Sequence, residues 1–377
     1  MKIGILTQPL RNNYGGLLQA YALKKTLEDS GNEVWILQRE AAQWYDDKRR
    51  FVITPIKRAI KIILRKPTGL TLNELKLISG ETEKFVNKYF LNKSPRLLST
   101  IKLKEYVEEN GFDAIVVGSD QVWRPIYNAD IRNNFLDFCE GDTTITRVAY
   151  AASFGVDTWE FSEEQTETCR RLAPLFDAIS VREDSGVELC RNYLGVSATH
   201  VLDPTLLLEK DDYVKLIQEW GEQQSRGDLF CYILDSDDKK MSFIDDAKRK
   251  TGLAPFSVYP RLKRSPENVR KHPESCVYPR VTQWLRAFND AEMVITDSFH
   301  GCVFSIIFNI PFWCIGNPER GNARFDSLLK LFHLEDRLVG TNAQDINFNA
   351  PIDWTSVNEI RKEMIVKSMK VLNILHS

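Results

Sequence analysis

The sequence predicts an α/β protein with two domains, each built on a parallel sheet, and three observations lead to this fold class. Short apolar, β-branched runs alternate with helical segments along the whole chain. A chain of 377 residues exceeds what a single core usually organises. The stretch 291–316 (AEMVITDSFHGCVFSIIFNIPFWCIG) reads as strand, turn, buried helix and second strand. We therefore expect two α/β domains that face each other across a cleft.

The first domain is expected over 1–210. It opens with a strand at 2–7, a glycine-containing loop at 11–16, a helix at 17–29 that Gly31 stops, and a strand at 33–38. Further strands are expected at 113–123, 147–155 and within 177–186, and the stretch 199–208 is expected to hold a strand and a turn at Asp203-Pro204. A polar stretch then places the hinge between about 205 and 225.

The second domain is expected over 211–355, with strands at 229–234 and 256–260, a helix at 281–289 and the 291–316 unit. A final helix within 356–377 is long enough to pack back across both domains.

The composition is that of a globular protein in a reducing compartment. It has 43% hydrophobic and 27% charged residues, and its formal charge of −2 provides no field for nucleic acid. The seven cysteines lie far apart and away from the histidines, so neither a disulfide framework nor a metal site is expected. The N-terminus enters a strand directly, and no span of 18 apolar residues occurs, so we expect a cytoplasmic protein.

A basic segment at 48–66 interrupts the strand pattern. Its isoleucines fall on one helical face and its lysines and arginines on the rest. Such a helix can lie on an anionic membrane surface, or it can be a solvated helix packed on the domain. Both interpretations stay open.

Polar residues cluster at the expected strand exits. Because these exits meet at the domain cleft, they form one candidate ligand site. The exits carry Asn13, Gly15 and Gly16; Gly118, Ser119 and Asp120; Ser153; Arg182; and Ser298, His300 and Gly301.

Two of these exits suit an anionic ligand. The helix that begins after Ser298 offers free amides and a positive dipole end, with His300 beside them as a titratable group. The planar guanidinium of Arg182 matches two phosphate or carboxylate oxygens. The simpler alternatives are that Ser298 only caps a helix and that Arg182 forms a surface ion pair with its acidic neighbours.

Six blocks, in order, resemble the polysaccharide pyruvyl transferases. They are NNYGGLLQAYAL, IVVGSDQVW, YAASFG, ISVREDSG, VLDPTLLL and VITDSFHGCVFSIIFNIPF. The resemblance implies a fold similar to the GT-B glycosyltransferases, phosphoenolpyruvate as donor and a sugar as acceptor. The product would be a pyruvate ketal bridging two hydroxyls, formed with release of phosphate and without a cofactor.

The resemblance also assigns roles. The arginine of the family's S-V-R-E block, implicated in donor binding, matches Arg182, and the histidine of its His-Gly block matches His300. Many members carry an arginine two residues before this histidine, where this chain has Ser298. Arg324 or Arg280 would then have to supply the missing charge.

A mechanism follows as a hypothesis. His300 would act as general acid, with Gly301 at the anion-binding helix start, and Asp120 would accept the proton of the attacking hydroxyl. Residues of the first domain, namely Asn13, Gly15, Gly16, Ser119 and Ser153, would contact the acceptor, a sugar or a lipid-linked oligosaccharide. Two alternatives are a glycosyltransferase that uses a nucleotide sugar and a non-catalytic glycan-binding relative.

Overall fold

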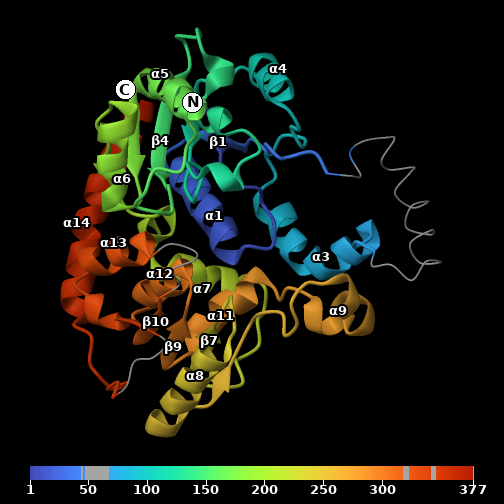
Figure 1. The fold of residues 1–377 in the computed structure, drawn as a ribbon, viewed down its shortest axis with the longest axis vertical. Helices are drawn as coiled ribbons and strands as arrows, with labels where there is room; N and C mark the ends of the chain where they lie inside the picture. The colour runs from blue at the N-terminus through green and yellow to red at the C-terminus, as the bar shows by residue number, and fades with distance from the viewer. Residues whose placement is uncertain (44–45, 47–67, 317–321, 341–344, 377) are drawn as a thin grey trace.

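The computed structural model describes residues 1–43, 46, 68–316, 322–340 and 345–376. It contains two parallel sheets in separate halves of the molecule, stacked one above the other in Figure 1. The basic segment at 48–66 lies outside the described residues.

The first sheet has six strands in the order β2-β1-β3-β4-β5-β6, all parallel. Its strands are β1 (Lys2–Leu6), β2 (Glu33–Ile36), β3 (Ala114–Val117), β4 (Thr146–Ala152), β5 (Ala178–Val181) and β6 (Thr199–His200). The helices of this half of the sequence are α1 (Tyr14–Asp29), α3 (Leu72–Tyr89), α4 (Thr100–Asn110), α5 (Glu163–Leu172) and α6 (Asp184–Leu189). Every residue of β3 is buried, as expected where helices cover both faces of a parallel sheet.

The second sheet has five strands in the order β11-β10-β9-β7-β8, again parallel. Its strands are β7 (Leu229–Tyr232), β8 (Pro255–Phe256), β9 (Met293–Thr296), β10 (Phe312–Ile315) and β11 (Leu338–Val339). The helices after β6 are α7 (Lys210–Glu219), α8 (Asp238–Thr251), α9 (Pro266–Lys271), α10 (Pro273–Cys276), α11 (Val281–Asp290), α12 (Phe299–Phe308), α13 (Ala323–Leu331) and α14 (Trp354–Leu372).

Two element boundaries differ from the sequence predictions for local reasons. Helix α1 begins three residues earlier than predicted, because the Asn13 side chain caps it by accepting from Gly16 N at 3.1 Å. The strand predicted within 199–208 is only the two residues of β6. There the Asp203 side chain accepts from Thr205 N and starts a short 3₁₀ helix over Pro204–Leu207.

Helix α3 belongs by sequence to the first half but packs against the second. Its residue Ile78 shares a small hydrophobic cluster with Val269 and Cys276, and Ile78 O accepts from Tyr278 N at 2.9 Å. Figure 1 shows α3 beside α9, between the two sheets. The sequence reading missed this helix, although its Thr71 and Glu74 form a capping box.

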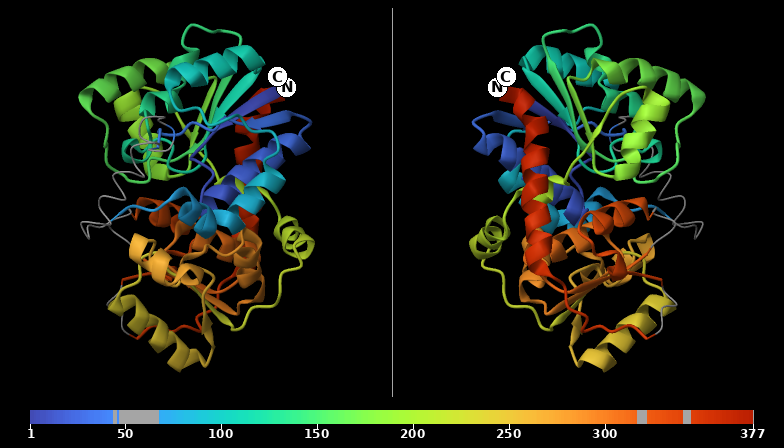
Figure 2. Two further views of the ribbon diagram at one scale, coloured as in Figure 1. Left: turned by 90° about the vertical axis from the view of Figure 1, so that its right-hand side faces the viewer. Right: turned by 90° about the vertical axis from the view of Figure 1, so that its left-hand side faces the viewer.

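The last helix, α14, returns to the first sheet. It contacts β4 and β5, and Ser368 Oγ accepts from Leu202 N at 3.0 Å. Arg361 Nε donates to Leu206 O at 3.1 Å. Figure 2 shows α14 running along both halves of the molecule, so it joins them on the side away from α3.

Candidate active site

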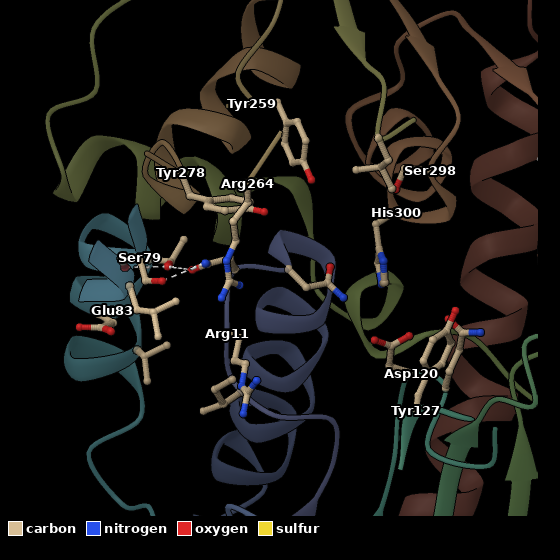
Figure 3. Close-up of a pocket in the computed structure, with 18 of the residues that line it drawn as sticks. Arg11, Ser79, Glu83, Asp120, Tyr127, Tyr259, Arg264, Tyr278, Ser298 and His300 are labelled. Carbon is tan, nitrogen blue, oxygen red and sulfur yellow. Dashed lines mark hydrogen bonds between the residues drawn. The ribbon is translucent and has the colours of Figure 1, made fainter. Parts of the chain in front are cut away.

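A cavity of about 900 Å³ lies between the two halves. One side, the His300 wall, consists of Asp120, Tyr127, Ser298, His300 and Arg324. The opposite side, the α3 wall, consists of Leu72, Leu75, Ser79, Glu83, Tyr259, Arg264 and Tyr278. Figure 3 shows His300 descending from the second half toward Asp120 and Tyr127 of the first, with α3 across the cavity. Both halves therefore build this site.

The turn that presents His300 is rigidly held. Asp297 is 1% exposed and accepts from Leu234 N at 2.7 Å, from Asp235 N at 3.1 Å and from Lys240 Nζ at 2.7 Å. Gly301 lets α12 pack on β9, because a Cβ there would collide with the Thr296 side chain. Asp297 and Gly301 thus hold the turn in shape, and this shape places Ser298 and His300 in the cavity wall.

The His300 imidazole reaches across to the first half of the molecule. Its Nε2 lies 3.5 Å from Asp203 Oδ2, and its ring packs against Gly15, where a Cβ would overlap Nδ1. The His300 side chain is only 8% exposed. Gly15 therefore leaves room for the imidazole and does not line the cavity itself.

Behind this wall, Arg182 lies among carboxylates. Its Nη1 donates to Asp203 Oδ2 at 2.9 Å and its Nε to Glu183 Oε1 at 3.2 Å, while Nη2 lies 3.5 Å from Asp120 Oδ1. Its guanidinium carbon also sits 4.4 Å from the centre of the Phe299 ring. Burial lowers the pKa of Arg182, but the charges of Glu183, Asp203 and Asp120 outweigh it, so the net shift is upward.

This placement differs from the sequence expectation for Arg182. Its side chain is 1% exposed and is absent from the cavity lining, and its donors face carboxylates of the protein. In this geometry Arg182 organises Asp120 and Asp203, and direct contact with a donor in the cavity would require it to leave them.

Asp203 lies between the arginine and the histidine. Its side chain is fully buried, and its second oxygen accepts from Thr205 N at 3.0 Å and from Thr205 Oγ1 at 2.7 Å. Burial raises the pKa of Asp203, but the neighbouring His300 and the charge of Arg182 hold it far below its usual value. The sequence reading treated this residue only as part of a turn.

The two arginines proposed to replace the missing family arginine lie in different places. Arg324 lines the cavity, and burial together with the nearby charge of Arg182 lowers its pKa to about 10. Arg280 is 42% exposed, lies outside the cavity lining and forms an ion pair with Glu81 at 2.9 Å. Only Arg324 is placed to meet a ligand there, so Arg280 is corrected to a surface residue.

The cavity also meets the N-termini of two long helices. Asn13 caps α1, and Ser298 occupies the N-cap position of α12 without a side-chain capping bond; both line the cavity. The first amides of a helix lack intrahelical acceptors and carry its positive dipole end. An anion between these two termini would therefore be stabilised from both halves.

The remaining predicted acceptor residues are structural in this conformation. Ser119 Oγ donates to Ala151 O at 2.8 Å and Ser153 Oγ to Glu183 Oε1 at 2.7 Å, and both side chains are fully buried. Gly16 N donates to the Asn13 cap. Among the predicted acceptor residues, Asn13 alone is in the cavity lining.

A second cavity of about 640 Å³ adjoins the first on the side of the first sheet. The two share Arg11, Asn13, Gln43, Asp120, Gln121 and Tyr127. Its other polar lining residues include Gln8, Asn128, Asn133 and Asn134. Asp120, with a left-handed φ of 65°, thus stands at the junction of the two spaces.

Several lining residues were not predicted from the sequence. Arg11 is the first residue of the loop predicted at 11–16, so it was within reach of the strand-exit argument. Tyr127 ends the short 3₁₀ helix Pro125–Tyr127, and Tyr259, Arg264 and Tyr278 lie in loops. Tyr259 falls in the stretch predicted as a strand at 256–260, of which only Phe256 belongs to β8.

Two further findings limit the chemistry and the setting. Within the described part of the chain, no group of three or more His, Cys, Asp or Glu side chains is arranged to hold a metal ion. The described helices include none whose length and apolar character would allow it to cross a membrane.

Solved structures resemble this chain in fold alone. An Arabidopsis thaliana enzyme crystallised with UDP-L-rhamnose has a TM-score of 0.53 at 10% identity, with 99% of this chain and 98% of that chain covered. UDP-N-acetylglucosamine 2-epimerase of Rickettsia bellii has a TM-score of 0.48 at 12% identity, covering 100% and 96%. The two facing parallel-sheet domains form the GT-B-like fold that the sequence predicted.

Among curated proteins, none matches this sequence. The model of one family, described as polysaccharide pyruvyl transferase, matches residues 13–319. That range includes His300, Asp120, Arg182 and Asp203, and it covers most of the chain. The chain belongs to the polysaccharide pyruvyl transferase family and is a transferase.

Proposed function

We propose that this protein transfers the enolpyruvyl group of phosphoenolpyruvate to a sugar and closes it into a pyruvate ketal. The observation that carries the proposal is the His300 wall: an imidazole, the Arg324 guanidinium and two helix N-termini meet at one cavity between the domains. A small ligand with a carboxylate and a phosphate matches this set of positive groups.

The donor would bind at Ser298 and Arg324. The amides at the start of α12 and the Ser298 hydroxyl would hold the phosphate or carboxylate, and Arg324 would neutralise its charge. Because Arg324 is partly buried, its charge acts in a medium that screens it less than water does. A single cation there replaces the family arginine that is absent at Ser298.

The chemistry would proceed through two oxocarbenium-like centres. His300 protonates the methylene carbon of the donor, the first sugar hydroxyl adds to the neighbouring carbon, and phosphate leaves with its bonding electrons. The second hydroxyl then closes the ketal. The two sugar hydroxyls together lose two protons. One restores the proton that His300 gave to the methyl group, and the other leaves on the phosphate. The reaction therefore needs no cofactor.

Asp120 would act on the acceptor. It faces the cavity between the donor position and the second space, and its Oδ1 lies 3.5 Å from Arg182 Nη2. From there it would take the proton of the attacking hydroxyl. The amide-rich second cavity would hold the sugar of the acceptor, because amide side chains match vicinal hydroxyls as donors and acceptors.

The test is phosphate release. Purified protein is incubated with phosphoenolpyruvate and a panel of free and lipid-linked sugars, and phosphate is measured with each acceptor present or absent. Release that requires both substrates supports the proposal. Release of a nucleoside diphosphate from a nucleotide sugar, measured in the same way, or stabilisation by nucleotide sugars alone in a thermal shift, would point to a glycosyltransferase instead.

Contact with a membrane-linked acceptor remains a separate proposal that rests on the basic segment at 48–66. Flotation with anionic liposomes tests it, with a variant in which these lysines and arginines are replaced by glutamine as the control.

A further inference from the structure

We infer that Asp203 is a positioning residue for His300, holding the imidazole of the second domain from a carboxylate of the first. The residue lies after β6, more than ninety positions from His300 in the sequence, and the fold alone brings them together. For its kinetic test, this inference rests on the proposed function.

The contacts around Asp203 divide between its two oxygens. Oδ1 is satisfied by Thr205, through N at 3.0 Å and Oγ1 at 2.7 Å. Oδ2 accepts from Arg182 Nη1 at 2.9 Å and faces His300 Nε2 at 3.5 Å. Arg182 and Thr205 thus fix the carboxylate, and its remaining direction points at the imidazole.

The environment favours an ionised carboxylate in this position. The charges of His300 and Arg182 hold the pKa of Asp203 far below its usual value despite burial. A buried anion next to one ring nitrogen orients the ring and keeps a proton on that nitrogen. Nδ1 is then the nitrogen that does not face the carboxylate, and it lies at the first turn of α1, near Gly15.

His300 Nε2 is buried and forms no hydrogen bond within the described residues, and it faces Asp203 Oδ2 at 3.5 Å. Such contacts in a ligand-free site are often long and shorten when substrate closes the domains. The arrangement makes the orientation of the acid depend on the two domains being together.

The kinetic experiment is a double-mutant cycle with the variants Asp203→Asn, His300→Gln and the pair combined. Asp203→Asn keeps the shape of the side chain but removes the charge. We expect it to lower kcat at least about tenfold in the wild-type background, with the KM for phosphoenolpyruvate changed less than about threefold. In the His300→Gln background the same change should cost no more than about twofold, since its effect runs through the imidazole.

Asp177→Asn is the matched control. It removes the same charge from a carboxylate that accepts from Arg147 N at 2.8 Å and that lines neither cavity. Its kcat should stay within about twofold of wild type. An equal loss from Asp203→Asn in both backgrounds would show that Asp203 acts through Arg182 or through stability, and would overturn the inference.

A spectroscopic measurement that needs no substrate tests this inference independently of the proposed function. In ¹⁵N spectra of the histidine side chains, the His300 signal is identified by its loss in His300→Gln. We expect a ring protonated at Nε2 in the wild type and a changed tautomer population in Asp203→Asn. A ring protonated only at Nδ1, or a spectrum indifferent to Asp203→Asn, would refute the positioning role even if phosphoenolpyruvate were not the donor.

Discussion

The two walls of the cavity are held by opposite kinds of contact. Behind the His300 wall, Arg182 and Asp203 are 1% and 0% exposed and share their charges with Glu183, Asp120 and His300. The α3 wall is tied to the second half by pairs such as Arg270 and Glu74, 35% and 20% exposed. Removing one partner of a buried ion pair leaves the other charge buried and unpaired, whereas water screens the charges of an exposed pair. Changes of charge should therefore cost more behind the first wall than at the exposed pairs that help to hold α3.

The largest effect should come from His300. Replacing it by alanine removes the proposed acid and should lower kcat about 100-fold or more, while the fold is kept. Phosphate release at saturating phosphoenolpyruvate measures this, and the melting temperature serves as the check on folding. Near-normal turnover in this variant would remove His300 from the mechanism.

A slightly smaller loss is expected from Gly15→Ala. The new methyl group would overlap the imidazole and displace it from Asp203, so kcat should fall about tenfold or more. Gly16→Ala is the matched control on the same turn, because a Cβ there meets only the Asn13 side chain, at 2.9 Å. Similar kinetics for the two variants would contradict the close packing of His300 on Gly15.

The next effect concerns donor binding. Arg324→Gln should raise the KM for phosphoenolpyruvate about tenfold, because it removes the cation that lines the cavity beside Ser298 and His300. Arg280→Gln breaks an exposed ion pair outside the cavity and should leave this KM within about twofold. The reverse pattern would place the replacement for the missing family arginine at Arg280.

The smallest effect belongs to the α3 wall. Burial raises the pKa of Glu74, but hydrogen bonds from Arg270 and Thr71 lower it to about 2. Its folded pKa lies below the ordinary value of 4.5, so its stabilisation is present above pH 4.5 and is lost as the pH falls toward about 2.

Glu74→Gln should therefore cost no more than about 1 kcal/mol of unfolding free energy near neutral pH, since the pair is partly exposed. Urea unfolding at neutral pH and again below pH 4.5 measures this, and the difference from wild type should shrink at the lower pH. A difference that grows on acidification would show that Glu74 does not stabilise the fold through its charge.

The sequence by itself determined the fold class, the order of most strands and the turn that carries His300. The residues of β3 and β9 form unbroken buried runs, and α12 follows β9 directly. The hydrophobic pattern along the sequence and the short distance between these segments therefore predicted these elements. Asp120 and Ser298 were found for the same reason, as residues at strand exits. The α3 helix carried a capping signal that was overlooked.

Only the tertiary structure decided which polar residues reach the cavity. Arg182, Ser119 and Ser153 also follow strands, yet their side chains are buried and bond to groups of the protein. Arg324 and Arg280 look equivalent in the sequence and differ only in the neighbours that folding gives them. Asp203 meets His300 because two separate sheets face each other. Local spacing fixes where a residue stands on its own strand or helix, but the distance between residues on different domains depends on packing of the whole chain.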